Sequence, residues 1–126
     1  MAKLLIVDDS ATERDFLRDM LVKAGHVVVA AASGREGVEA AKRERPDLIF
    51  MDIVMDDVDG YHATRTLKED PETSAIPVVV VSSKNQKADK MWAQLQGAKA
   101  YVVKPCTPEA VLKHVDELAG GGGAAA

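Results

Sequence analysis

The chain has 126 residues, of which 47% are hydrophobic and 29% charged, a composition typical of a single soluble globular domain and not of a disordered chain. Its net charge of −4 argues against a nucleic-acid partner, because binding to phosphates requires a clustered basic face. The single cysteine excludes an internal disulfide, and neither a signal peptide nor a membrane-spanning apolar run is evident. We therefore expect a cytoplasmic protein without membrane insertion.

The chain begins with a strand, a helix and a second strand. The apolar run Leu4–Val7 predicts a strand that is buried on both faces of a sheet. Ser10 and Glu13 have the spacing of a capping box, which predicts a helix that begins here and ends at Gly25. The β-branched run His26–Ala30 predicts the second strand.

A second helix, a third strand and a short third helix follow. The capping-box spacing recurs at Ser33 and predicts a helix that Pro46 closes. The run Leu48–Asp52 predicts a buried strand that ends on a carboxylate. An acidic loop over residues 54–60 separates this strand from a helix expected over Tyr61–Lys68.

The remaining elements are two strands and two helices. Strands are expected at Val78–Val81 and Ala100–Val103. Between them lies a helix over Gln86–Gln96, in which Trp92 is expected to anchor the packing. Thr107 is expected to cap the last helix.

Alternation of strands and helices with short connections forces parallel pairing and right-handed crossovers. The predicted fold is therefore α/β, a doubly wound five-stranded parallel sheet with five helices. Residues 1–119 would form this domain, and the glycine- and alanine-rich residues 120–126 would form a flexible tail.

Polar side chains follow four of the five predicted strands. In chain order they are Asp8 and Asp9, Asp52, Ser82 and Lys104. Because ligands bind at the carboxyl ends of parallel strands, we expect these groups to converge at one edge. Converging carboxylates repel one another unless a cation lies among them, so the pattern predicts a Mg²⁺ site with Asp9 and Asp52 as direct ligands.

The same groups suit phosphoryl transfer. The metal ion and Lys104 would neutralise the charge of a phosphoryl group, and Ser82 would donate a hydrogen bond to one of its oxygens. Asp52 would act as the nucleophile and form an acyl phosphate.

Together these motifs resemble the receiver domain of two-component response regulators, the CheY-like family, over residues 3–119. The resemblance rests on the segments Val7–Ser10, Met51–Met55 with Gly60, Val81–Ser83 and Lys104–Pro105. It implies the strand order 2-1-3-4-5 and assigns Asp52 as the phosphoacceptor. It further assigns Asp9 and the main-chain carbonyl of Val54 as metal ligands, Asp8 as a ligand through water, Ser82 and Lys104 as phosphate contacts, and Tyr101 as the aromatic switch residue.

A closer likeness is to stand-alone receivers of the chemosensory systems that control twitching motility by type IV pili. It rests on residues 60–65, 72–78 and 89–98. It implies a monomeric signalling protein, not an enzyme in the ordinary sense, that a CheA-like histidine kinase phosphorylates on Asp52 with Mg²⁺. A pilus motor or other output protein would bind the face formed by the fourth helix, fifth strand and fifth helix.

Alternatives remain open within and outside this interpretation. The protein could be a phosphate sink for the same kinase or a chemotaxis regulator that acts on a flagellar motor. A binding-only pseudo-receiver and a Mg²⁺-dependent phosphohydrolase are rivals of other classes. Two residues depart from the family or are unassigned: Asp56, where the family usually has proline, is expected to be solvated, and Cys106 is expected to fill space.

Overall fold

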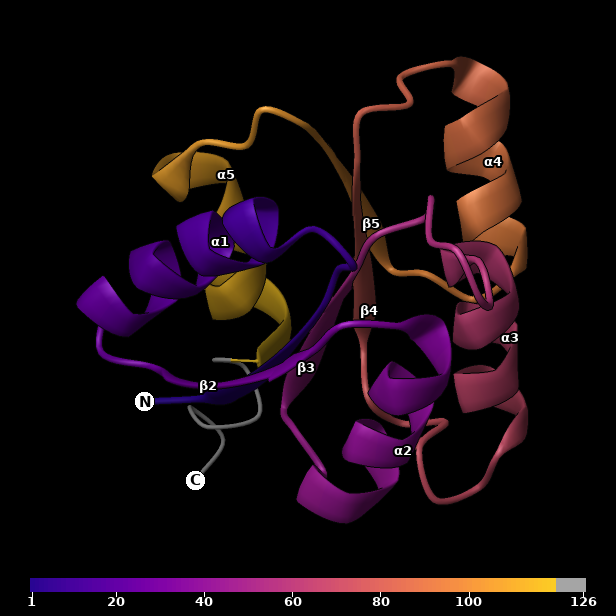
Figure 1. Cartoon of the computed structure of the whole chain (residues 1–126), viewed down its shortest axis with the longest axis horizontal. Coiled ribbons are helices and arrows are strands. Elements are labelled where there is room, and N and C mark those ends of the chain that lie inside the picture. The colour runs from indigo at the N-terminus through magenta and orange to yellow at the C-terminus, as the bar shows by residue number, and fades with distance from the viewer. Residues whose placement is uncertain (120–126) are drawn as a thin grey trace.

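The computed structural model describes residues 1–119, and its five strands form one parallel sheet in the order β2-β1-β3-β4-β5 (Figure 1). The strands are β1 (Lys3–Val7), β2 (Val27–Ala31), β3 (Leu48–Met51), β4 (Val78–Ser82) and β5 (Ala100–Val103). This order confirms the predicted doubly wound fold. The tail predicted over residues 120–126 lies outside the described residues.

Helices cover both faces of the sheet, with α1 and α5 on one side and α2, α3 and α4 on the other (Figure 1). Their bounds are α1 (Ala11–Lys23), α2 (Gly34–Glu44), α3 (Gly60–Glu69), α4 (Lys87–Leu95) and α5 (Pro108–His114), the last continuing as a π-helical segment, η1 (Val115–Ala119). No helix among residues 1–119 has the length and apolar character to cross a membrane.

Two main apolar layers hold the sheet between these helices, and alternate residues of each strand enter opposite layers. In β1, Leu4 and Ile6 pack toward α1 and α5, whereas Leu5 and Val7 pack toward α2 and α3. The central strand β3 is fully buried on both faces, as its continuous apolar run predicts. Burial of both faces leaves only the strand ends free to present polar groups.

The register between β1 and β3 places their carboxyl ends side by side. Val7 lies opposite Met51, so that Asp8 and Asp52 are the next residues along each strand. The Asp52 backbone N–H continues the pairing by donating to the carbonyl oxygen of Val7 at 2.9 Å. Strand pairing alone therefore brings the two acidic positions together.

Two local predictions require correction. Ser10 Oγ accepts from the Glu13 backbone N–H at 3.3 Å, but the Ser10 N–H donates to Asp8 at 2.9 Å, so the reciprocal half of the capping box is absent. Trp92, which was expected to anchor the packing of this helix, is 52% exposed and does not pack against the sheet. Its ring instead meets the ring of Tyr61 on α3 edge-on, with the centroids 6.4 Å apart.

Candidate phosphoacceptor and metal site

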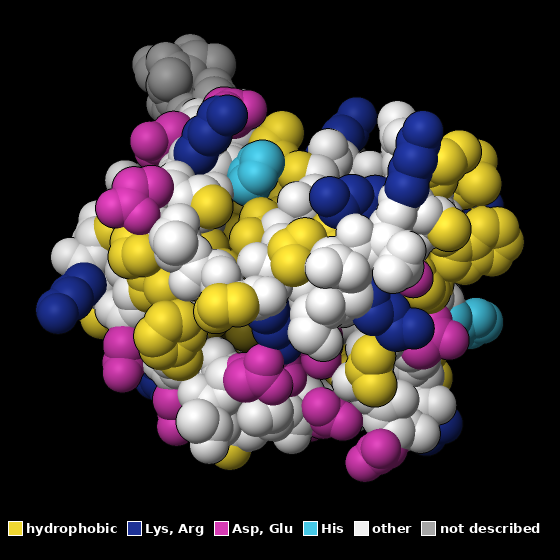
Figure 2. Space-filling model, turned by 90° about the horizontal axis from the view of Figure 1, so that it is seen from above, with side chains coloured by type: hydrophobic (Ala, Val, Ile, Leu, Met, Phe, Trp, Pro, Cys, Tyr) yellow, Lys and Arg dark blue, Asp and Glu magenta, His cyan; other side chains and the backbone are white. Residues whose placement is uncertain are grey.

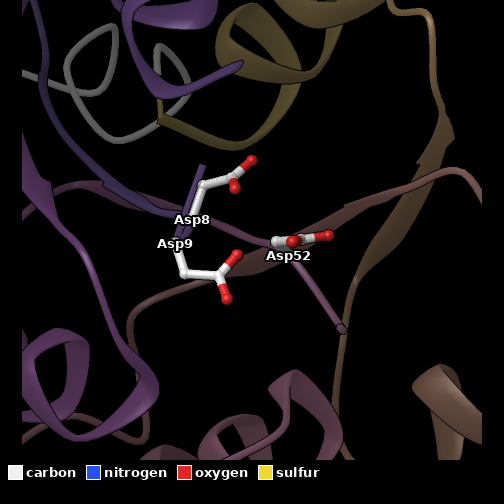
Figure 3. Close-up of side chains that lie close together, drawn as sticks. All are labelled: Asp8, Asp9 and Asp52. Carbon is white, nitrogen blue, oxygen red and sulfur yellow. The ribbon is translucent and has the colours of Figure 1, made fainter. Parts of the chain in front are cut away.

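Three carboxylates meet at the carboxyl end of the sheet. Asp8 and Asp9 follow β1 and Asp52 follows β3, and one oxygen of each lies within 4.8 Å of the others (Figure 3). Asp8 and Asp52 are only 5% and 8% exposed, whereas Asp9 is exposed. The predicted convergence of these acids is confirmed, and it comes from the parallel pairing of two buried strands.

The environment of Asp52 disfavours its charged form. Burial raises the pKa of Asp52 from 3.8 to about 6, and the nearby Asp8 carboxylate adds to the rise while Lys104 opposes it. A cation among these oxygens would remove much of this cost. Hard carboxylate oxygens clustered at this spacing are also the ligand type that Mg²⁺ prefers, so the residues present fit that ion.

Lys104 reaches into the carboxylate cluster from the end of β5. Its Nζ lies 3.0 Å from Asp8 and 3.6 Å from Asp52, which confirms that it converges with the acids. Burial lowers the pKa of Lys104, but hydrogen bonds with Glu13 and Asp8 outweigh burial and hold the pKa above its ordinary value. The lysine is therefore a permanent positive charge at this site.

Glu13 is a member of this site that sequence reasoning missed. Its carboxylate lies 2.8 Å from Lys104 Nζ, although the sequence assigns Glu13 to the helix cap. The available signal was its place in the first turn of α1, directly after the acidic pair. A carboxylate there faces the same edge of the sheet as Asp8.

Ser82 and Tyr101 are linked through one residue of the β4–α4 loop. The fully buried Ser82 Oγ accepts a hydrogen bond from the Lys84 backbone N–H at 3.2 Å. The hydroxyl of the half-buried Tyr101 donates to the carbonyl oxygen of the same Lys84 at 2.8 Å. A movement of Ser82 would therefore disturb the position of Tyr101 through Lys84.

The acidic loop after β3 is fastened to α2 by Asp57, a second residue that sequence reasoning did not single out. Its carboxylate accepts from the backbone N–H groups of Gly34 and Arg35, both at 3.1 Å, at the start of α2. Hydrogen bonds from the Val58 backbone and from these N–H groups lower the pKa of Asp57 to about 2. The anchored loop carries Val54, whose side chain is exposed, and Asp56, which is exposed as expected of a solvated residue.

Gly60 closes this loop against the site. A Cβ atom at this position would lie 2.0 Å from the carbonyl oxygen of Asp52, so any larger residue would push the loop away from Asp52. Its N–H donates to the carbonyl oxygen of Ile53 at 2.9 Å. The close approach of Gly60 to the backbone of Asp52 and Ile53 thus fixes the position of the loop that contains Val54.

A mostly apolar hollow of about 240 Å³ lies beside the carboxylates, between α1 and the segment after β5. Its lining includes Phe16, Lys104 and Cys106. Cys106 is half-buried, and burial raises the pKa of its thiol. A thiol with a raised pKa is a poor nucleophile at neutral pH, which agrees with a space-filling role.

The doubly wound sheet, the acidic cluster at its carboxyl edge and the lysine beside it define a phosphorelay signalling domain. A model of the response regulator receiver domain matches residues 4–116, and the chain belongs to this family. Proteins of this family are signalling proteins that histidine kinases phosphorylate, and they are not conventional enzymes.

Three relatives show how close the likeness is. Protein PilH of Pseudomonas aeruginosa is 49% identical over 121 residues, which cover 96% of this chain and 100% of PilH. The structure of the chemotaxis protein CheY4 of Vibrio cholerae has a TM-score of 0.88 at 30% identity, with 94% of this chain and 98% of that chain covered. The receiver domain of the sensor histidine kinase PA1611 of Pseudomonas aeruginosa, with a magnesium ion coordinated in its active site cleft, has a TM-score of 0.88 at 25% identity over the same shares.

Proposed function

We propose that this protein is a stand-alone response regulator that takes a phosphoryl group from a CheA-like histidine kinase onto Asp52 in a Mg²⁺-dependent reaction. The observation that carries the proposal is the convergence of Asp8, Asp9 and Asp52 within 4.8 Å, with Lys104 Nζ 3.6 Å from Asp52. An ion pair with only a structural role needs one acid and one lysine, whereas this site gathers three acids and a lysine from the ends of three strands.

The metal would be held directly by Asp9, Asp52 and the main-chain carbonyl of Val54, and by Asp8 through water. When bound, Mg²⁺ supplies positive charge that neutralises the oxygens of the transferred group. It would also favour the ionised form of Asp52, whose pKa burial raises to about 6. Support for this ion comes from the donor set and from the magnesium-bound receiver of PA1611.

In the transfer step, a carboxylate oxygen of Asp52 forms a bond to phosphorus as the phosphorus–nitrogen bond of the donor phosphohistidine breaks. The electron pair of the broken bond stays with the departing imidazole, and Asp52 becomes an acyl phosphate. Lys104 would move from Glu13 toward the new phosphoryl oxygens, while Ser82 would donate a hydrogen bond to one of them. Asp52 starts this step as an anion, so no proton has to leave it.

Phosphorylation would then act as a switch through the β4–α4 loop. Attraction of the Ser82 hydroxyl to the phosphoryl group would strain the hydrogen bond that Ser82 Oγ accepts from the Lys84 N–H at 3.2 Å. Because the Tyr101 hydroxyl donates to the carbonyl oxygen of Lys84, a shift of Lys84 would also affect Tyr101. The phosphoryl group need only favour one arrangement of this loop by a few kcal/mol to shift the population.

Acetyl phosphate provides a direct test, because a receiver can take phosphoryl groups from it without a kinase. With Mg²⁺ the native protein is expected to be labelled once, on Asp52. Asp52→Asn and Asp9→Asn should each remove the label, and the exposed Asp56→Asn serves as a control that should keep it. Equal labelling of the native protein and Asp52→Asn would exclude Asp52 as the acceptor. Turnover of phosphomonoesters would instead favour a phosphohydrolase.

The cellular process we infer is control of type IV pilus twitching motility in the cytoplasm, supported by 49% identity to PilH over its whole length. A phosphate sink for the same kinase, or a regulator of a flagellar motor, is the alternative. The decay rate of phospho-Asp52 and a pull-down against pilus motor and flagellar motor proteins separate the three roles. A sink would lose phosphate quickly and capture neither motor.

A further inference from the structure

The outward face of α4 carries a stripe of apolar side chains. Ala88, Met91, Trp92 and Leu95 follow the spacing i, i+3, i+4 and i+7, which places them on one side of the helix. Met91, Trp92 and Leu95 are 55%, 52% and 63% exposed. A surface helix normally places such a stripe against the core and leaves charged residues outside.

The fold does not require this stripe. The opposite side of α4 packs onto the sheet through Ala93, which joins Ile53 and Val80 in a buried cluster. Trp92 meets Tyr61 edge-on, so the apolar area extends from α4 onto α3. A hollow of about 230 Å³ between Tyr61, Arg65 and Trp92 borders it and is large enough to receive a side chain.

Lysines flank the stripe, although the whole chain is acidic. Residues 84–99 contain four lysines and one aspartate, whereas the net charge of the chain is −4. Figure 2 shows hydrophobic side chains gathered next to Lys and Arg side chains on the α4 side of the molecule. Lys87 and Lys90 are the exposed lysines of α4 itself. The surface is therefore apolar at its centre and positive along one edge.

We propose that this α3–α4 surface, formed by Tyr61, Met91, Trp92 and Leu95 with Lys87 and Lys90 at its edge, binds an amphipathic helix of a partner protein. The partner helix would carry an apolar stripe that packs along α4 and acidic residues that meet the two lysines. The charge selects this occupant, because a second copy of the chain would bring the same positive edge to the interface and be repelled.

The position differs from the expected output face of α4, β5 and α5. The β5 side of α4 is lined by Lys90, Gln94, Lys99 and Tyr101 together with Ala93, Ala98 and Ala100, so Lys90 borders both sides. Its apolar lining consists of these small side chains and one tyrosine ring, whereas the α3 side exposes the larger Met91, Trp92 and Leu95. Burial of exposed apolar side chains is the main source of affinity in helix recognition, so the α3 side is the better anchor.

The surface is connected to the phosphoacceptor site through the start of α4. The Tyr61 hydroxyl donates to the carbonyl oxygen of Asp89 at 3.2 Å, and Asp89 in turn accepts from the Gln86 backbone N–H at 3.2 Å. Gln86 lies two residues after Lys84, which contacts both Ser82 and Tyr101. Regulation of this surface by phosphorylation rests on the proposed function, whereas the binding itself does not.

A synthetic helical peptide with leucines at i, i+3, i+4 and i+7 and flanking glutamates is the probe. Trp92 is the only tryptophan, so its emission reports docking directly. The peptide is expected to shift this emission to the blue and protect it from acrylamide quenching. Leu95→Glu, and Lys87→Glu with Lys90→Glu, should each weaken binding at least about tenfold.

The matched controls are Val22→Glu, which alters a side chain of α1 that is 51% exposed, and Lys23→Glu on the same helix. Both should bind the peptide like the native chain in the absence of Mg²⁺ and phosphodonor. The use of unphosphorylated protein separates failure here from failure of the phosphoacceptor assignment.

Four outcomes would overturn the inference. The first is an unchanged Trp92 emission at saturating peptide, and the second is equal affinity for a peptide with lysines in place of the glutamates. The third is that Val22→Glu weakens peptide binding as much as Leu95→Glu does. The fourth is a concentration-dependent dimer that buries Trp92 and that Leu95→Glu dissociates. The last result would assign the surface to a second copy of this chain.

Discussion

The ammonium group of Lys104 lies closer to Glu13 than to Asp52, at 2.8 Å against 3.6 Å. The lysine is therefore shared between a carboxylate at the rim and the buried carboxylate at the centre of the site. The Glu13 side chain is half exposed, so that solvent weakens its attraction. Lys104 can exchange this partner for a stronger anion at Asp52 with little cost.

Lys104→Met should destabilise the metal-free protein at pH 7.5 by on the order of 2 kcal/mol, because it leaves buried carboxylates without a counter-charge. The deficit should shrink as the pH falls toward 5, since Lys104 lowers the pKa of Asp52 and its loss lets Asp52 bind a proton earlier. Urea unfolding in EDTA at both pH values measures this. Lys3→Met, which breaks the surface pair with Glu44 at 2.8 Å, is the control and should change little. An equal deficit at both pH values would contradict the explanation.

Asp52→Asn should stabilise the metal-free protein above pH 6. The pKa of Asp52 is raised from 3.8 to about 6 in the fold, so the folded state holds a proton that the unfolded chain has lost between these values. The contribution of Asp52 to the free energy of unfolding is therefore fully present below pH 4. As the pH rises through 6, this contribution falls by up to about 3 kcal/mol. The gain of the variant should vanish toward pH 4. A gain that is independent of pH would refute the assignment to this carboxylate.

Millimolar Mg²⁺ should raise the melting temperature by relieving repulsion among Asp8, Asp9 and Asp52. At ten times the dissociation constant the stabilisation is about 1.4 kcal/mol, or roughly 5 °C. Asp9→Asn should remove most of the shift, while Asp15→Asn on the exposed side of α1 should preserve it. Differential scanning fluorimetry with and without EDTA decides between these results, and an identical shift in both variants would place the ion elsewhere.

Asp57→Ala should weaken Mg²⁺ binding by roughly tenfold, because it releases the loop that carries Val54 from the start of α2. Asp57→Asn should fall between the native protein and Asp57→Ala, since its amide oxygen still accepts one of the two bonds. Titration calorimetry measures the affinities, with the neighbouring Asp56→Ala as the matched control. Loss of stability without loss of Mg²⁺ affinity would limit Asp57 to a structural role.

Much of the fold and of the candidate site follows from local pattern alone. The buried runs Leu4–Val7 and Leu48–Met51 can be recognised because both faces of a central parallel strand are covered. Once these strands are parallel, Asp8, Asp9 and Asp52 have to meet, since parallel strands end at the same edge. No knowledge of side-chain positions was needed for that step.

Only the tertiary structure decided which partners these groups take. Glu13 pairs with Lys104, and Asp57 caps α2, through contacts between residues far apart along the chain, which no local spacing encodes. The outward direction of Trp92 is of the same kind. Apolar residues occupy both sides of α4, so periodicity cannot tell the buried side from the exposed one, and packing of Ala93 against the sheet makes that choice.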